Sequence, residues 1–129
     1  MYCLDTNIII EFLKGNKIII DKINNLWQKD EIFITMISLC ELYKGIYLSS
    51  KLEFELNILD EFLDSISVID FNKESCKFFG EFFSKLQKIG KTTNEFDLMI
   101  ASIVKSHNLI LITKDKKHFE NTGISVEVW

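Results

Sequence analysis

The fold is decided by the stretch Met1-Tyr2-Cys3-Leu4-Asp5-Thr6-Asn7-Ile8-Ile9-Ile10. An apolar run leads into Asp5, a polar Thr-Asn pair follows, and a second apolar run then begins. This order predicts a short buried strand, a tight turn and the start of a helix. Asp5 therefore ends a strand, and the crevice at the carboxyl ends of strands is where open α/β sheets bind ligands. The alternative role for Asp5 is to cap the helix that follows it.

Strands and helices alternate through the remainder of the chain. Short apolar or β-branched runs predict strands at 31–35, 65–71, 109–113 and 124–129. Apolar residues at helical spacing predict helices at 8–13, 18–27, 36–48, 51–63, 73–89 and 95–107, the last two after caps at Asn72 and Asn94. Strands joined by helices form right-handed crossovers, so we expect an α/β fold: a three-layer α/β/α sandwich with a mainly parallel central sheet. The alternation in the last strand suggests an edge position.

Length and composition predict one domain spanning residues 1–129, because 129 residues that are 47% hydrophobic can bury a core without disulfides. The three cysteines, Cys3, Cys40 and Cys76, stand among apolar neighbours, which predicts small buried thiols in a reducing compartment. No apolar run is long enough for a membrane span, and the first residues lack the basic start of a signal peptide. We therefore expect a cytoplasmic protein with no membrane partner.

The charge pattern argues against a conventional nucleic-acid binder. The formal net charge is −4, and all 15 basic residues are lysine. Without arginine the chain has no planar fork for phosphate or guanine, so nucleic-acid contacts must come from lysines, backbone amides or metal ions. If four of the 19 acids bound divalent ions, the remaining acids would be balanced by the lysines.

Three further acids stand where a purely structural role is not the only explanation. Glu41 lies on a partly apolar helix face, where the alternative is a rim glutamate paired with Lys44. Asp97 lies in the first turn of its helix, where the alternative is a capping box with Asn94. Asp115 follows the strand at 109–113 and so repeats the position of Asp5, the alternative being a turn aspartate.

Convergence of these four carboxylates would require cations. Two carboxylates about 5 Å apart repel by roughly 3 kcal/mol at an effective dielectric constant of about 20. An all-oxygen ligand set with no cysteine or histidine at metal spacing favours Mg²⁺ or Mn²⁺ over Zn²⁺. Such ions bind phosphodiesters and activate water, so the chemistry implied is phosphodiester hydrolysis.

The order of four motifs resembles a PIN-domain nuclease, and more narrowly the VapC-type toxins of toxin–antitoxin pairs. The motifs are Asp5-Thr6-Asn7, Ser38-Leu39-Cys40-Glu41-Leu42 with Gly45, Asp97-Leu98-Met99-Ile100-Ala101, and Thr113-Lys114-Asp115 with Phe119. The resemblance covers essentially the whole chain. It implies a metal-dependent endoribonuclease that cleaves RNA with water activated at an acidic Mg²⁺ or Mn²⁺ site.

The resemblance also implies roles for single residues and partners. Asp5, Glu41, Asp97 and Asp115 match the family's catalytic, metal-binding quartet, and Thr6, Asn7 and Thr113 match supporting positions, with Asn7 the better candidate because its amide can both donate and accept. The family forms homodimers and is silenced by a cognate antitoxin. Phe96 departs from the small polar residue that many relatives carry before the third acid, which affects the expected substrate detail.

Other residues receive weaker assignments. Glu95 is left outside the acidic set because residues two apart on a helix do not face each other. His107 and His118 are expected at helix ends or on the surface rather than in catalysis. The candidate lysines for an RNA path, each of which has a solvated surface charge as its alternative, are Lys14, Lys44, Lys88, Lys91, Lys114, Lys116 and Lys117. The aromatic residues that belong either to the core or to a partner surface are Trp27, Tyr43, Tyr47, Phe54, Phe62 and the stripe from Phe78 to Phe83.

Two alternative functions remain at this level. One is a catalytically silent PIN-fold scaffold, against which the four intact acids argue. The other is a DNA-directed PIN nuclease, a branch that generally carries inserted segments for which 129 residues leave no room.

Overall fold

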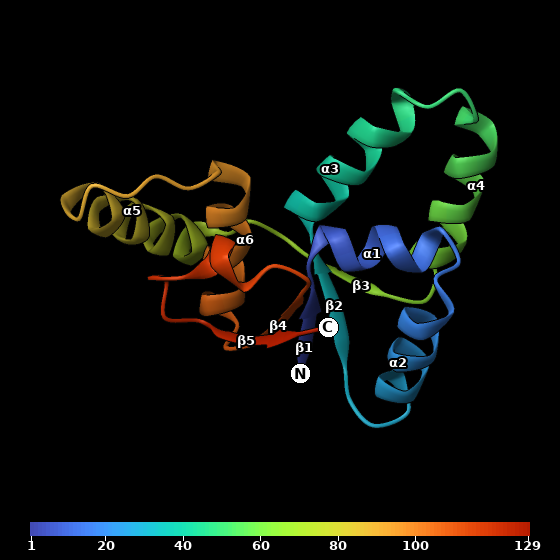
Figure 1. Cartoon of the computed structure of the whole chain (residues 1–129), viewed down its shortest axis with the longest axis horizontal. Helices are drawn as coiled ribbons and strands as arrows, with labels where there is room; N and C mark the ends of the chain where they lie inside the picture. The colour runs from blue at the N-terminus through green and yellow to red at the C-terminus, as the bar shows by residue number, and fades with distance from the viewer.

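A computed structural model describes residues 1–129 and contains a single five-stranded sheet (Figure 1). The strands are β1 (Tyr2–Leu4), β2 (Ile32–Thr35), β3 (Ser67–Ile69), β4 (Ile110–Thr113) and β5 (Ser125–Val128). Their order across the sheet is β3-β2-β1-β4-β5, and all neighbouring pairs are parallel. The predicted parallel sheet and the edge position of the last strand are confirmed.

The helices lie within a residue or two of their predicted positions. They are α1 (Thr6–Leu13), α2 (Lys17–Trp27), α3 (Met36–Tyr47), α4 (Leu52–Leu63), α5 (Lys73–Lys88) and α6 (Glu95–Ser106), followed by a 3-10 helix, η1 (Lys116–Phe119), that the sequence did not predict. Asn72 and Asn94 cap α5 and α6 through their side-chain oxygens, as predicted. None of these helices combines the length and apolar character that crossing a membrane requires.

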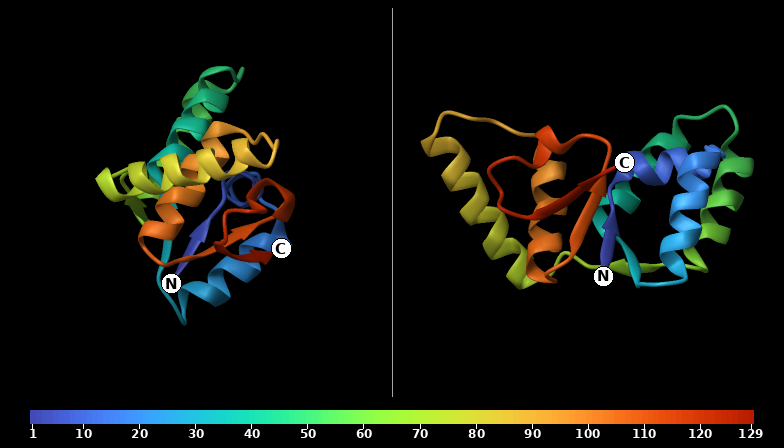
Figure 2. Two further views of the ribbon diagram at one scale, coloured as in Figure 1. Left: turned by 90° about the vertical axis from the view of Figure 1, so that its left-hand side faces the viewer. Right: turned by 60° about the horizontal axis from the view of Figure 1, so that its bottom comes forward.

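Two apolar cores separate the sheet from a helical layer on each face. Leu4, Ile34 and Ile112 point from three strands into the core that α1, α2, α3 and α4 cover. Cys3 and Leu111, one position earlier on their strands, point into the core under α5 and α6. This alternation follows from the two-residue repeat of a strand and gives the three-layer α/β/α sandwich. Figure 2 shows the two helical groups on either side of the sheet.

The site is positioned by the reversal of strand order at β1. From β1 the chain builds outward through β2 to β3, whereas β4 and β5 lie on the other side of β1. Such a switch point leaves a crevice at the carboxyl ends of the two central strands. Asp5 directly follows β1 and Asp115 follows β4 by two positions, so both acids lie at that edge.

The aromatic residues divide between core and surface. Phe12, Trp27 and Phe62 pack against one another beside the first core. On α5 Phe82 is buried, whereas Phe83 is 44% exposed. Tyr47 and Phe54 are more exposed still, at 66% and 63%.

The expectation that all three cysteines are buried is wrong for two of them. Cys3 is fully buried in the sheet, and its burial raises the pKa of its thiol. Cys40 on α3 and Cys76 on α5 are exposed free thiols. Apolar neighbours in the sequence misled the prediction, because adjacent residues on a helix point in different directions.

Candidate active site

Asp5 is held by hydrogen bonds from both sides of the strand edge. Its side chain is nearly buried, at 4% exposure. Oδ1 accepts a hydrogen bond from the Thr6 backbone N–H at 2.8 Å, and Oδ2 accepts one from the Thr113 hydroxyl at 2.6 Å. The same Thr113 oxygen accepts from the Asp115 backbone N–H at 3.2 Å. Asp5 therefore caps α1 and also faces β4, so the two roles considered for it coexist.

Glu41 reaches the same edge from α3 through a chain of hydroxyl groups. Oε1 of Glu41 accepts a hydrogen bond from the Thr6 hydroxyl at 2.7 Å. That hydroxyl also lies 3.0 Å from Ser38 Oγ, which in turn contacts the Thr35 hydroxyl that caps α3. The alternative of a rim glutamate paired with Lys44 is not realised.

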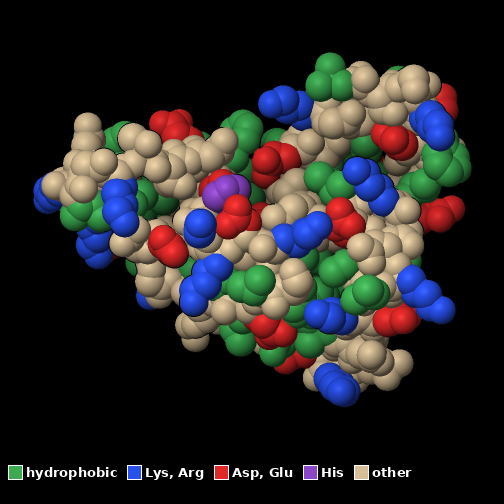
Figure 3. Space-filling model, in the orientation of Figure 1, with side chains coloured by type: hydrophobic (Ala, Val, Ile, Leu, Met, Phe, Trp, Pro, Cys, Tyr) green, Lys and Arg blue, Asp and Glu red, His purple; other side chains and the backbone are tan.

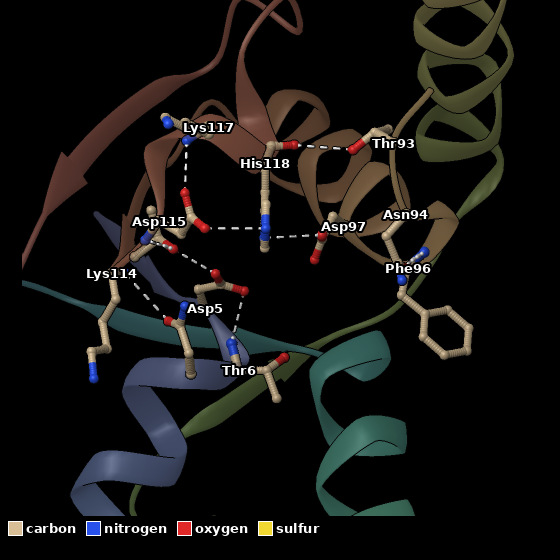
Figure 4. A network of polar contacts seen from close by, with 12 residues as sticks. Asp5, Thr6, Thr93, Asn94, Phe96, Asp97, Lys114, Asp115, Lys117 and His118 are labelled. Carbon is tan, nitrogen blue, oxygen red and sulfur yellow. Dashed lines mark hydrogen bonds and ion pairs between the residues drawn. The ribbon is translucent and has the colours of Figure 1, made fainter. Parts of the chain in front are cut away.

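Asp97 and Asp115 are joined by an imidazole ring, as Figure 4 shows. His118 Nδ1 lies 3.3 Å from Asp97 Oδ2, and His118 Nε2 lies 3.1 Å from Asp115 Oδ2. The Thr93 hydroxyl donates to the His118 carbonyl at 3.3 Å, which ties η1 to the segment before α6. His118 is a surface residue, as expected, but its place between two candidate acids was missed because η1 was not predicted.

Electrostatic repulsion from neighbouring acids affects the pKa values of Asp97 and Asp5. Partial burial raises the pKa of Asp97 to about 6, and the charges of Asp5, Glu41 and Asp115 add to this rise while His118 opposes it. Burial also raises the pKa of Asp5, against the opposing hydrogen bonds from Thr113 and Thr6. Carboxylates that raise one another's pKa in a crevice are typical of functional sites.

The three residues predicted to support the acids make different contacts. Thr6 links Asp5 to Glu41, whereas Asn7 only accepts a hydrogen bond from the Lys114 backbone N–H at 3.4 Å. Asn94 caps α6 through the Phe96 N–H, and the Asp97 carboxylate turns toward His118 instead of closing a capping box. Glu95 lines a separate pocket between α5 and α6, which agrees with leaving it outside the acidic set.

Comparison with known proteins identifies the family. The family model described as "PIN domain" matches residues 2–124. This chain belongs to the PIN-domain family. The curated relatives include "Ribonuclease VapC1" of Haemophilus influenzae strain R2866, which is 31% identical with 100% of this chain and 98% of the relative covered. The "tRNA(fMet)-specific endonuclease VapC" of Shigella flexneri is 30% identical, with 99% of this chain and 97% of the relative covered.

Solved structures of PIN-domain proteins agree with the fold. VapBC2 from Rickettsia felis, solved bound to a DNA fragment from its promoter, superposes with a TM-score of 0.93 at 30% identity, covering 99% of this chain and 98% of that chain. VapBC-1 from nontypeable Haemophilus influenzae superposes with a TM-score of 0.88 at 32% identity, covering 99% and 97%. The chain is thus a PIN domain of the VapC type.

The acids of this PIN domain fit a hard divalent cation. They offer only carboxylate oxygens, the ligands that Mg²⁺ and Mn²⁺ prefer, and their repulsion adds to the effect of burial in raising the pKa of Asp97. No three acidic, histidine or cysteine side chains already form a group arranged to hold an ion. The carboxylates of Asp97 and Asp115 are instead bridged by His118, the Asp5 carboxylate is held by Thr113, and Thr6 ties Glu41 to the strand edge.

An apolar groove ends at this acidic site. It has a volume of about 340 Å³ and runs between α1, α3 and α4, with Glu41 in its lining. Its apolar lining consists of Ile10, Leu13, Leu42, Ile46 and Ile58. Beside the groove, Lys114 Nζ lies 3.4 Å from Glu11. Figure 3 shows acidic side chains and a histidine on this face of the PIN domain, with lysines close to them.

Proposed function

We propose that this PIN domain is a metal-dependent endoribonuclease and the toxin of a toxin–antitoxin pair. The observation that carries the proposal is the arrangement of Asp5, Glu41, Asp97 and Asp115, which come from four segments; burial raises the pKa of Asp97, and the charges of the other three acids raise it further. The VapC relatives, which are named as ribonucleases and as a tRNA-specific endonuclease, support RNA as the substrate.

In the proposed hydrolysis, some of these residues would hold the metal ion and others would orient its ligands. A bound Mg²⁺ or Mn²⁺ ion would supply a Lewis acid for the phosphodiester and an activated water. Asp5 is buried and the Asp97 side chain is 16% exposed, and these two carboxylates would hold the ion, with the partly buried Glu41 and Asp115 completing its surroundings. Thr113 and Thr6 orient Asp5 and Glu41 through short hydrogen bonds, which keeps the carboxylates in place before substrate binds.

The apolar groove is the proposed binding site for a segment of the antitoxin. An apolar strand or helix in the groove would bury Leu13, Leu42 and Ile58, and its end would lie next to Glu41. A basic side chain there would neutralise the carboxylates and exclude the metal ion. The VapBC complexes among the structural relatives support a protein partner of this kind.

A homodimer is the further assembly that we propose. The hairpin patch, defined as Tyr47, Leu48 and Phe54 at the turn between α3 and α4, exposes 66%, 81% and 63% of these side chains. Apolar side chains clustered at such exposure are typical of a subunit interface. Figure 3 shows hydrophobic side chains at this end of the molecule.

The ribonuclease proposal is tested with labelled bulk tRNA and total RNA. The purified chain is incubated with Mg²⁺, with Mn²⁺ or with EDTA, beside Asp97→Asn and Asp5→Asn variants. Asp21→Asn on α2, an exposed acid far from the site along the chain, is the matched control. We expect cleavage with metal ions by the unmodified chain and by Asp21→Asn only.

The alternatives predict other patterns in the same experiment. A scaffold would leave every RNA intact under all conditions. A DNA-directed nuclease would cut single- or double-stranded DNA included in parallel reactions and spare the RNA. Either result would overturn the proposal.

A further inference from the structure

Phe96 is an exposed aromatic residue directly beside a candidate metal ligand. It precedes Asp97 in the first turn of α6, and 42% of its surface is exposed. Its backbone N–H donates to Asn94 Oδ1 at 2.8 Å, so the cap fixes the start of the helix and the backbone from which the ring extends. Figure 4 shows the ring extending from the helix away from His118, outside the network of polar contacts.

The ring has no partner that explains it. Phe96 belongs to neither apolar core, and it forms no contact with another aromatic ring, unlike Phe78 with Phe82 on α5. It also lies outside the lining of the antitoxin groove. A side chain that keeps 42% of its surface exposed gains only part of the free energy that full burial of the ring would give.

The chain has few other groups that could hold a nucleobase. Single-stranded RNA is bound by stacking its bases on aromatic rings or guanidinium planes. Guanidinium planes are absent here because the sequence has no arginine. Among the aromatic residues with large exposure, Tyr47 and Phe54 belong to the hairpin patch and Phe83 lies on α5, so Phe96 alone is adjacent in sequence to one of the four acids.

We propose that Phe96 is a substrate-positioning residue, on which a base next to the scissile phosphate of the RNA stacks. Every base has a π-face, so stacking would favour unpaired nucleotides without reading a particular sequence. Anchoring the neighbouring base would hold the phosphodiester at the carboxylates. This anchor matters because a chain with net charge −4 does not attract RNA through its overall charge. The inference rests on the proposed ribonuclease function.

The test compares variants that keep or remove the π-face. Phe96→Tyr and Phe96→Trp keep it, Phe96→Leu keeps the apolar surface alone, and Phe96→Ala removes both. Using the RNA that the unmodified chain cuts, we expect KM to rise about tenfold or more in the Leu and Ala variants, while Tyr and Trp stay near the original value. Phe83→Ala on α5, where the ring is 44% exposed and lies outside the hairpin patch, is the matched control.

A second measurement observes the stacking itself. In the Asp5→Asn background, a short oligoribonucleotide carrying 2-aminopurine beside the cut position is titrated with protein. Stacking on Phe96 is expected to change the 2-aminopurine fluorescence, and Phe96→Leu is expected to abolish that change. Urea unfolding and the rise in melting temperature on adding Mg²⁺ should be the same for Phe96→Leu and the unmodified chain, which shows that fold and metal site are intact.

Each outcome separates this inference from the proposed function. If the unmodified chain cuts RNA and Phe96→Leu has the same KM and the same fluorescence change, the stacking role is wrong and the ribonuclease remains. If Phe96→Leu instead changes the molecular mass in solution, Phe96 contacts a second copy and the stacking role is again wrong. If the unmodified chain cuts no RNA, the proposed function itself fails.

Discussion

Thr113 connects the Asp5 carboxylate to the backbone of Asp115 through one hydroxyl group. It donates to Asp5 Oδ2 at 2.6 Å and accepts from the Asp115 N–H at 3.2 Å, and its side chain is fully buried. Thr113→Val keeps the shape but leaves a buried carboxylate without this donor. We expect the free energy of unfolding to fall by about 1–3 kcal/mol in urea titrations.

The exposed Thr92→Val serves as the control for that substitution. A change of no more than about 0.5 kcal/mol is expected there, since surface substitutions away from such contacts are nearly neutral. Equal stability of the two variants would show that the Thr113 hydroxyl does not support Asp5.

Asp97 makes the stability of the metal-free protein depend on pH. Its pKa is about 6 in the folded chain against an ordinary value of 3.8, so between these values the folded state binds more protons than the unfolded state. Stability contributed by protonated Asp97 is therefore present in acid and is lost as the pH rises toward about 6.

Asp97→Asn should remove this dependence, because an amide does not titrate. In EDTA, melting temperatures measured by calorimetry from about pH 4 to about pH 7 should fall more steeply for the unmodified chain than for the variant. Added Mg²⁺ should restore the unmodified chain near pH 7 and leave the variant unchanged. Parallel pH curves for the two proteins would contradict the assigned pKa.

Among single residues, the sequence predicted the acids better than the groups that connect them. The four acids could be chosen because each stands at a strand end or on a helix face beside one. His118 could not be placed, since its position depends on a 3-10 turn whose only local signal is the Asp115 side chain accepting from the Lys117 N–H at 3.1 Å. Cys40 and Cys76 were wrongly predicted to be buried, because the direction in which a side chain leaves a helix, and not the apolar character of its sequence neighbours, decides its exposure.

Two glycines, one inside α5 and one just beyond its end, have opposite conformational demands. Gly80 lies in the middle of the helix, whereas Gly90 follows its end with φ of +70°. A Cβ atom at either position would meet no atom within 4 Å, so packing does not decide the effect of alanine. Gly80→Ala should stabilise the protein by about 0.5–1 kcal/mol, because alanine loses less backbone entropy.

Gly90→Ala should destabilise the protein by about 1 kcal/mol, since a left-handed backbone is unfavourable for alanine. Urea unfolding of both variants measures the two changes in one helix. Changes of the same sign would show that the end of α5 does not depend on the conformation of Gly90.

At the scale of elements, local sequence signals were sufficient to predict where strands and helices lie but not which strands are neighbours in the sheet. Apolar periodicity and the caps at Asn72 and Asn94 set the boundaries of α5 and α6 because these signals act within a few residues. Which strand lies beside β1 depends on packing between distant segments. The sequence suggested that β1 and β4 are neighbours only through the repeated position of Asp5 and Asp115.

At the scale of the whole molecule, the hairpin patch predicts the state of association. Burial of Tyr47, Leu48 and Phe54 against a second copy would give a particle of twice 15.1 kDa by light scattering. Leu48→Lys introduces charges into that contact and should shift the mass to that of one chain, because unpaired charge is costly to bury.

Ile18→Lys, at a site on α2 that is 70% exposed and outside the hairpin patch, should leave the particle unchanged. A particle of one chain in the unmodified protein at micromolar concentration would rule out this dimer. A dimer that persists in Leu48→Lys would move the interface to another face.

The bond between Thr113 and Asp5 joins residues 108 positions apart, which has a consequence for the order of events during synthesis. Strand β1 leaves the ribosome before its neighbour β4 is translated. A nascent chain therefore carries Asp5 before Thr113 and Asp115 have been made. Since the acids come together only when β4 joins the sheet, a chain interrupted before β4 lacks the complete acidic site, and formation of the site requires the slow pairing of strands far apart in the sequence.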